Sequence, residues 1–278
     1  MTKRLAYLGP AGTYSEQAAL DYEPTANLLP FASIPAVAAA VDSGLADECI
    51  VPIENSLEGS VTFTLDLLIH DSKLFIRNEL VIPIEHCLIV KSGTKFEDIK
   101  TVFSHPQSLG QCRSFLEKRF PAASQVASLS NSAAVEEMLK SEVTAAAIAS
   151  QRAAFLYDAE ILAQGIADNS NNHTRFVILA PSDHAPTGMD KTSLCFSFDE
   201  DSPGIVHSVL ADIARRNINL TKIESRPTKQ TLGRYIFLLD IEGHRLDANV
   251  SEALDAVKAQ VSMLKVFGSY PMQVSSSV

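Results

Sequence analysis

The 278-residue sequence has no apolar run that approaches the ~20 residues needed to cross a bilayer. Its first residues lead into a strand-like segment and lack the apolar core of a secretory signal. A basic surplus is also missing, because 33 acidic residues outnumber 23 lysines and arginines and give a net charge of −10. A broad surface for the phosphate backbone of nucleic acid is therefore not expected. We expect a soluble, cytoplasmic protein that binds neither membranes nor nucleic acid.

Paired cysteines and metal-binding motifs are absent as well. The four cysteines are widely spaced, lie among apolar or small residues and form no Cys-x-x-Cys pair. This usage predicts buried free thiols in a reducing compartment. The seven histidines are scattered without His-Glu-x-x-His or a comparable ligand spacing, so no metal site is predicted.

Two patterns of secondary structure follow each other along a chain that is longer than a usual single core. Up to about residue 180, short β-rich runs alternate with helical patterns, which indicates an α/β fold with helices on both faces of a sheet. The Pro-, Ser- and Gly-containing stretch 181–188 is the best linker candidate. Beyond it the order is βαββαβ, which is typical of a ferredoxin-like module.

Three helix starts are predicted from capping residues. Pro106 stands at the first turn of a helix expected to continue to residue 119. Asn131 or Ser132 is placed to cap a helix through residue 140. In the C-terminal module, Ser202 and Pro203 are expected to form the N-cap and first turn of a helix that runs to residue 216.

The segment Gly9-Pro-Ala-Gly-Thr-Tyr-Ser15 lies between a predicted strand and a predicted helix. Its glycines allow the backbone to approach a ligand, and the hydroxyls of Thr13 and Ser15 lie near free helix N–H groups, which suits a carboxylate or phosphate. It matches neither a Gly-x-Gly-x-x-Gly fingerprint nor a P-loop. A tight strand-to-helix turn explains the same residues equally well.

Two further predicted strands end in polar residues, where ligands of α/β sheets usually collect. The first leads into residues 54–60, in which Glu54 and Glu58 are either site carboxylates or helix-capping charges. The second leads into Ser104-His-Pro-Gln107. Neighbouring side chains on an extended chain point apart, so a Ser–His dyad is disfavoured and His105 is better explained as a cap or structural hydrogen-bonding group.

A polar run over 168–174 precedes the apolar strand that follows Arg175. It is either a solvated, asparagine-rich loop or a binding segment. In the second case, the hydroxyl of Thr174 and the guanidinium of Arg175 would grip a carboxylate and donate a hydrogen bond.

These four segments, in this order and spacing, resemble the prephenate dehydratase family. The C-terminal module resembles an ACT domain with its Asp-Ser-Pro-Gly (201–204) and Glu-Ser-Arg-Pro (224–227) segments. The resemblance covers residues 4–272. It implies a catalytic domain over 1–181 and an ACT domain over 192–270. The catalytic domain would have two lobes like those of type 2 periplasmic binding proteins, lobe one over about 1–78 and 168–181 and lobe two over about 79–165.

The resemblance implies a monofunctional enzyme that converts prephenate to phenylpyruvate, CO₂ and water in L-phenylalanine biosynthesis, without metal or organic cofactor. The enzyme would hold the dianionic substrate in a water-poor cleft. The family's essential threonine falls at Thr174, which would donate a hydrogen bond or proton to the departing hydroxyl. The other expected catalytic or orienting residues are Asn55, Ser104, Gln111 and Glu54. The expected substrate-binding residues are Thr13, Ser15, Arg175 and Phe176, although Arg175 is equally explained by a structural ion pair.

For the ACT domain, the resemblance implies feedback inhibition by L-phenylalanine bound between paired modules of a homo-oligomer, a dimer or a tetramer. The expected effector-binding residues are Pro203, Gly204, Ile205, Asn219, Leu220, Glu224, Ser225 and Arg226. Ile205 is bulkier than the alanine that usually follows this glycine in the family, so we expect a reshaped effector pocket. The Glu-Ser-Arg-Pro segment is alternatively only an interface turn.

Two other functions are compatible with the same residues. An arogenate dehydratase would act on the amino analogue of prephenate. A non-catalytic solute-binding protein with an ACT sensor would have no need for the Thr174 hydroxyl.

Overall fold

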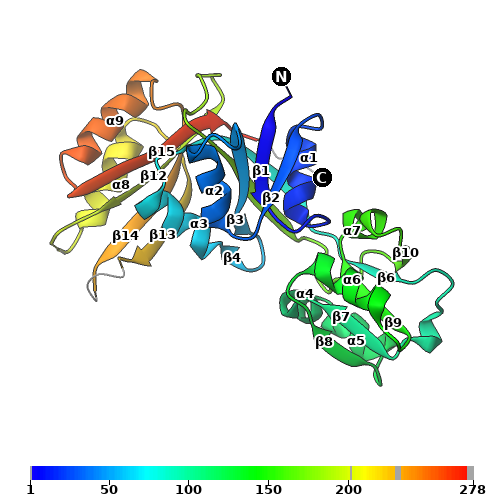
Figure 1. The fold of residues 1–278 in the computed structure, drawn as a ribbon. Coiled ribbons are helices and arrows are strands. Elements are labelled where there is room, and N and C mark those ends of the chain that lie inside the picture. The colour runs from blue at the N-terminus through cyan, green and yellow to red at the C-terminus, as the bar shows by residue number, and fades with distance from the viewer. Residues whose placement is uncertain (1, 201, 229–232, 274–278) are drawn as a thin grey trace. The chain divides into compact units, whose positions relative to one another are not determined.

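The computed structural model describes residues 2–200, 202–228 and 233–273 (Figure 1). They fall into two compact units, the first within Met1–Thr62 and Val81–Phe176 and the second within Phe63–Leu80 and Val177–Val278. The chain passes from one unit to the other at three places: after Thr62, within the strand β5 (Phe75–Pro83) and within the strand β11 (His173–Ala180). Asp201, which opens the predicted Asp-Ser-Pro-Gly segment, lies outside the described residues. The lobe and domain bounds given above stay predictions.

The first unit begins with parallel pairing around β1 (Arg4–Leu8). This strand pairs in parallel with β2 (Asn27–Phe31) and β3 (Glu48–Asn55), and β3 turns back into the short antiparallel β4 (Gly59–Ser60). The connecting helices are α1 (Tyr14–Tyr22) and α2 (Ile34–Asp42). Because β1 and β3 are parallel, their carboxyl ends lie on the same side of the sheet. Residues 9–15, which follow β1, and Asn55, the last residue of β3, are therefore both at this side.

The same unit contains a five-stranded sheet with helices on both faces (Figure 1). Its order is β10 (Glu160–Ala163), β6 (Cys87–Val90), β9 (Ala145–Ala149), β7 (Thr101–Ser104) and β8 (Ser124–Ala127). Side chains alternate along β6, so Cys87 and Ile89 pack with α6 (Asn131–Lys140) and α7 (Gln151–Leu156), whereas Leu88 and Val90 pack with α5 (Arg113–Arg119). The predicted α/β fold is confirmed.

Two predicted helix boundaries in this unit are wrong. The helix expected over 106–119 is broken at Cys112 into α4 (Pro106–Gln111) and α5. The break gives α5 its own amino-terminal N–H groups, and Ser114 N donates to both carboxylate oxygens of Asp168 at 3.2 and 3.1 Å. Helix α6 is capped by Ser130, whose Oγ accepts from Ala133 N at 3.0 Å, because the Asn131 side chain is used elsewhere.

The second unit contains the predicted βαββαβ module. Its elements are β12 (Asp190–Ser197), α8 (Ile205–Arg215), β13 (Leu220–Pro227), β14 (Tyr235–Glu242), α9 (Ala248–Lys258) and β15 (Met263–Pro271). The antiparallel sheet has the order β13-β14-β12-β15, and α8 and α9 cover one of its faces (Figure 1). The ferredoxin-like prediction is therefore confirmed.

The predicted start of α8 is wrong. The helix begins at Ile205, and its N-cap is Gly204 rather than Ser202. Gly204 has φ +85°, a backbone conformation that favours glycine. The first turn of α8 therefore has no side-chain cap.

Residues 63–80 belong to the same unit as the C-terminal module. They comprise most of α3 (Thr62–Asp66), a π-helical turn (Leu67–Asp71) and the first part of β5. The backbone of β15 lies close to β5, because a Cβ added at Gly268 would stand 2.2 Å from Ile76 O. Glu79 is buried and forms an ion pair with Lys191 at 2.8 Å. Within the described residues, no helix has the length and apolar character of a membrane span.

Candidate active site

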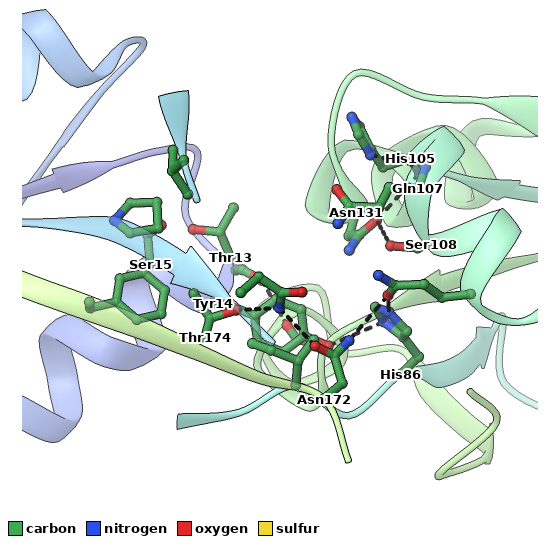
Figure 2. A pocket seen from close by; sticks show the side chains of 18 residues that line it. Thr13, Tyr14, Ser15, His86, His105, Gln107, Ser108, Asn131, Asn172 and Thr174 are labelled. Carbon is green, nitrogen blue, oxygen red and sulfur yellow. Dashed lines mark hydrogen bonds between the residues drawn. The ribbon is translucent and has the colours of Figure 1, made fainter. Parts of the chain in front are cut away.

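A pocket of about 250 Å³ lies in the first unit, slightly below the range of roughly 300–1,000 Å³ usual for small-molecule sites (Figure 2). It is formed where β3 ends and β11 begins, opposite the amino-terminal ends of helices. Its lining residues are Gly12, Thr13, Tyr14, Ser15, Pro52, Asn55, Val61, Ile84, His86, His105, Gln107, Ser108, Gln111, Asn131, Ser150, Asn172, Thr174 and Phe176. Six of the predicted site residues are therefore brought together: Thr13, Ser15, Asn55, Gln111, Thr174 and Phe176.

The lining is polar but carries no permanent charge. None of these described lining residues is a lysine, arginine, aspartate or glutamate. Helices α1 and α6 both begin at the pocket, at Tyr14 and Asn131. The N–H groups of a first helical turn have no partner within the helix, and the helix dipole makes this end attractive to anions. The pocket is thus suited to a small anion held by dipoles and neutral donors.

Asn55, the last residue of β3, holds Thr174 near the start of β11. Asn55 Oδ1 accepts from the backbone N–H groups of Leu57 and Glu58, each at 3.0 Å, which fixes the amide orientation. Its Nδ2 therefore donates, at 2.9 Å to Thr174 Oγ1 and at 2.7 Å to Asn172 Oδ1. Because Thr174 Oγ1 accepts from Asn55, its own O–H is left to donate to a ligand.

A chain of hydrogen bonds continues from Asn172 to His86 (Figure 2). Asn172 Nδ2 donates to Gln111 Oε1 at 3.2 Å, and His86 Nε2 lies 2.8 Å from the same oxygen. Gln111 Nε2 donates to Glu58 Oε1 at 3.1 Å. Both polar atoms of the Gln111 side chain therefore have hydrogen-bond partners within the protein. In this structure Gln111 orients Asn172 and His86.

His86 is almost completely buried, with an exposed fraction of 1%. Burial lowers its pKa, and the hydrogen bond to Gln111 opposes this shift. The Tyr14 hydroxyl lies 3.3 Å from Nδ1 of the ring and donates to the Glu85 carbonyl at 2.6 Å. Burial also raises the pKa of Tyr14 well above its ordinary value.

Ser104 does not reach the pocket surface. It is fully buried, and its Oγ lies 2.7 Å from Ile148 O and 3.1 Å from Asn131 Oδ1. The same Asn131 oxygen accepts from Ser108 Oγ at 3.0 Å and from His105 N at 3.3 Å. Asn131 Oδ1 is therefore occupied, and Nδ2 is the end that is left to donate to a ligand. Ser104 lies behind Asn131 and orients it.

The turn over residues 9–15 is held in place by side chains from several elements. Thr13 Oγ1 accepts from Glu16 N at 3.3 Å and donates to Pro10 O at 2.9 Å, so this hydroxyl caps α1. Glu16 Oε2 accepts from Gly12 N at 2.8 Å and pairs with Arg152 at 2.9 Å. Gly12 has φ +82°, and a Cβ there would lie 2.6 Å from Ser132 Oγ. This contact explains the glycine.

Glu54 and Arg175 are not among the pocket-lining residues. They face each other across 3.7 Å, between Arg175 Nη1 and Glu54 Oε2. The structural ion pair considered for Arg175 is therefore present. Phe176 is 2% exposed and supplies part of the apolar wall of the pocket.

The predicted effector residues lie in the second unit, at two places in the C-terminal module. Gly204 and Ile205 are at the start of α8. Leu220, Glu224, Ser225 and Arg226 lie on β13, and Asn219 directly precedes it. Arg226 is engaged twice, at 3.8 Å from Glu224 and at 3.4 Å from Asp66 of α3.

Twelve lining residues are absent from the sequence-based list, and three of them, His86, Asn131 and Asn172, belong to the hydrogen-bond networks described above. Asn172 lies inside the polar run over 168–174. This run indicated a possible binding segment, but it contains several polar residues and gave no reason to choose Asn172 among them. Asn131 was interpreted only as a helix cap. No local pattern marks His86, which follows Glu85 in the mainly apolar stretch 81–90. Among the described residues, no group of three or more His, Cys, Asp or Glu side chains could hold a metal ion.

The fold and the pocket define a class of protein: an α/β protein that has a small polar pocket suited to an anion and that carries a C-terminal ferredoxin-like module. Comparison with known proteins is more specific. The prephenate dehydratase family model matches residues 5–184, and the ACT domain model matches residues 200–259. The chain belongs to the prephenate dehydratase family and has a C-terminal ACT domain. This confirms the sequence-based assignment.

Relatives agree with this assignment over most of their length. A bifunctional chorismate mutase/prephenate dehydratase of Aquifex aeolicus is 42% identical, over 96% of this chain and 73% of that protein. A prephenate dehydratase of Mycobacterium bovis is 38% identical, over 96% of this chain and 87% of the relative. The crystal structure of an Arthrobacter aurescens prephenate dehydratase in complex with L-Phe has a TM-score of 0.89 and 34% identity, covering 97% of this chain and 90% of the other.

Proposed function

We propose that the pocket binds prephenate and converts it to phenylpyruvate, CO₂ and water, with Thr174 as the group that assists departure of the hydroxyl. The single observation that supports this most strongly is the direction of the Asn55–Thr174 hydrogen bond. Asn55 donates to Thr174 Oγ1 at 2.9 Å, which leaves the threonine O–H to donate into a pocket free of permanent charge. In such surroundings a fixed donor stabilises developing negative charge better than water does.

The reaction balances with one proton. The bond between the ring and its carboxylate breaks, and its electron pair enters the ring. The bond between the ring and the hydroxyl oxygen breaks, and that pair leaves with the oxygen. The departing oxygen takes up one proton, so prephenate dianion and a proton give phenylpyruvate anion, CO₂ and water. The hydrogen bond from Thr174 stabilises the oxygen as its charge develops.

Substrate binding is assigned to the neutral donors around the pocket. The first-turn N–H groups of α1, at Tyr14 and Ser15, and the Asn131 amide face it from different elements. Thr13 shapes the turn through its cap, and Phe176 forms an apolar wall for the ring. Ser104, Gln111, Glu54 and Arg175 act in this proposal by holding lining residues and the backbone in position.

Prephenate is preferred over arogenate in this proposal. Arogenate carries an ammonium group where prephenate has an oxo group, and a buried ammonium needs an anionic partner. The described lining residues include no carboxylate. Incubation of the protein with each compound separately, followed by product analysis, tests this choice. Conversion of arogenate alone would contradict it, and binding without conversion of either compound would identify a solute-binding protein.

L-Phenylalanine is the proposed feedback inhibitor, and the ACT domain is its proposed site. The module matches the ACT family, and the Arthrobacter aurescens relative was solved with L-Phe. The expected contacts are residues 203–205, which lead into α8, together with Asn219, Leu220, Glu224, Ser225 and Arg226. They would act between paired ACT domains of a dimer or tetramer. Activity measured with and without L-phenylalanine, together with the mass of the assembly in solution, tests both parts.

A further inference from the structure

His86 is a buried titratable group of the pocket to which the proposed reaction assigns no role. Nε2 of its ring faces Gln111 Oε1 at 2.8 Å, and Nδ1 faces the hydroxyl oxygen of Tyr14 at 3.3 Å. Gln111 Oε1 also receives the Asn172 amide, so this end of Gln111 is an acceptor. The Tyr14 O–H is directed to the Glu85 carbonyl at 2.6 Å, which leaves the tyrosine oxygen as an acceptor toward the ring.

Both ring nitrogens therefore face acceptors. A neutral imidazole has one N–H donor, whereas an imidazolium has two. If the neutral ring carries its proton on Nε2, the lone pair of Nδ1 points at the oxygen of Tyr14. If the ring is an imidazolium, both contacts become hydrogen bonds. The hydrogen-bonding groups around His86 are thus arranged for the protonated ring, while its burial favours the neutral one.

Whether His86 is neutral or protonated depends on the charges in the pocket, including those of a bound ligand. Because the described lining residues provide no lysine, arginine, aspartate or glutamate, a ligand with two carboxylates enters a site without a permanent counter-charge. Nearby negative charge favours the protonated form of a histidine. The ligand therefore opposes the effect of burial on His86.

We propose that binding of the dicarboxylate substrate is coupled to the uptake of one proton by His86, whose imidazolium then serves as the counter-charge of the bound dianion. The proton comes from solvent and joins Nδ1, and no other bond forms or breaks in this step. The inference rests on the proposed function, since it requires a substrate with two carboxylates.

The other titratable groups around the ring do not compete for this proton. Tyr14, Cys87 and Cys112 are kept neutral by burial, which raises the pKa of Cys87 to about 11 and that of Cys112 to about 12. The carboxylate of Glu58 accepts from Gln111 Nε2 at 3.1 Å, and those of Glu85 and Asp168 lie near Tyr14 and Cys112. His105 is the other imidazole of the pocket, and its Nδ1 accepts from Gln107 N at 3.3 Å as the cap of α4.

Proton uptake is measured by calorimetric titration of prephenate into Thr174→Ala, in which turnover is removed, in phosphate and in Tris at a slightly alkaline pH. The difference in binding enthalpy between the buffers counts the protons exchanged. We expect uptake approaching one proton per site. His86→Gln in the same background retains an N–H donor for Gln111 but does not titrate, so uptake is expected to vanish. His105→Asn, which keeps an acceptor for the cap, is expected to leave uptake unchanged.

Kinetics of the full-length protein give a second measurement. Above the pKa of His86, kcat/KM for prephenate is expected to fall about tenfold per pH unit through a rise in KM, and His86→Gln is expected to remove this dependence. Equal enthalpies in the two buffers, uptake that persists in His86→Gln, or uptake lost in His105→Asn would overturn the proposal for His86. Failure of the wild-type protein to convert prephenate would instead overturn the proposed function.

Discussion

The guanidinium of Arg226 in the Glu-Ser-Arg-Pro segment lies 3.4 Å from the carboxylate of Asp66, the last residue of α3. Helix α3 directly follows Val61, a residue that lines the pocket. The ion pair therefore links the predicted effector segment to a short helix that is continuous in the chain with the pocket wall. A change at Arg226 has a covalent route of a few residues to the pocket.

We predict that Asp66→Asn weakens inhibition by L-phenylalanine by about tenfold or more, within the usual range of coupling between sites, and leaves uninhibited turnover unchanged. The concentration of L-phenylalanine that halves the rate measures the effect. Asp71→Asn removes a carboxylate from the same segment but not this ion pair, and serves as the control. An unchanged inhibitory concentration in Asp66→Asn would show that the ion pair plays no part in regulation. Substitution is preferable to removal of the ACT domain, because residues 63–80 pack within the same unit.

We predict that Asn55→Asp lowers kcat by about 10²–10³-fold with a smaller effect on KM. The aspartate still accepts from Leu57 N and Glu58 N, but it cannot donate to Thr174 Oγ1. Thr174 would then donate to the carboxylate instead of the departing hydroxyl, a loss comparable to that of one transition-state donor. Steady-state kinetics test this. Leu57→Ala in the same turn is the control, because this exposed side chain is outside the pocket lining and its backbone N–H is kept; an unaltered kcat in Asn55→Asp would refute the role of the amide.

We predict that the ligand-free protein loses stability as the pH falls below about 6.5, the ordinary pKa of histidine, in part because of His86. Burial lowers the pKa of His86 in the folded state, so the unfolded state binds more protons in this range. The contribution is present above the unfolded pKa and is lost as the pH falls through the folded one. Urea unfolding at several pH values measures it. His86→Gln should show a shallower decline, and an identical decline would exclude this contribution.

We predict that Lys191→Met lowers the free energy of unfolding by about 3–5 kcal/mol, because it removes the ammonium group that pairs with the buried carboxylate of Glu79 at 2.8 Å. Chemical denaturation measures the change. Lys140→Met removes a lysine from the exposed pair with Glu136 and should have a much smaller effect. Similar losses in the two variants would show that burial does not distinguish the pairs.

Sequence patterns were sufficient for the architecture. Alternating apolar runs predicted the α/β region, and the βαββαβ order was readable from strand and helix lengths. The ends of helices were less predictable, because the free N–H groups of a first helical turn can be satisfied by residues that are far away in the sequence. Asp168 provides acceptors for a second helix start after Cys112, and no local pattern near residue 112 signals this contact.

The site was predictable where polar residues follow strands, as at Asn55 and Thr174. The tertiary partners were not predictable. Ser104 directly precedes the pocket-lining His105 in the sequence, but its own side chain is buried and holds Asn131 by a hydrogen bond. His86 reaches the pocket only because the chain between β5 and β6 passes Tyr14 and Gln111. Such contacts join residues that are far apart in sequence, so spacing alone does not reveal them.

The most direct measurement compares Thr174→Val with Thr174→Ser in the formation of phenylpyruvate from prephenate. Valine keeps the shape of the side chain without the hydroxyl, and serine keeps the hydroxyl. We predict that turnover falls by about three orders of magnitude in Thr174→Val and stays within about tenfold of wild type in Thr174→Ser. Wild-type turnover by the valine variant would contradict the account.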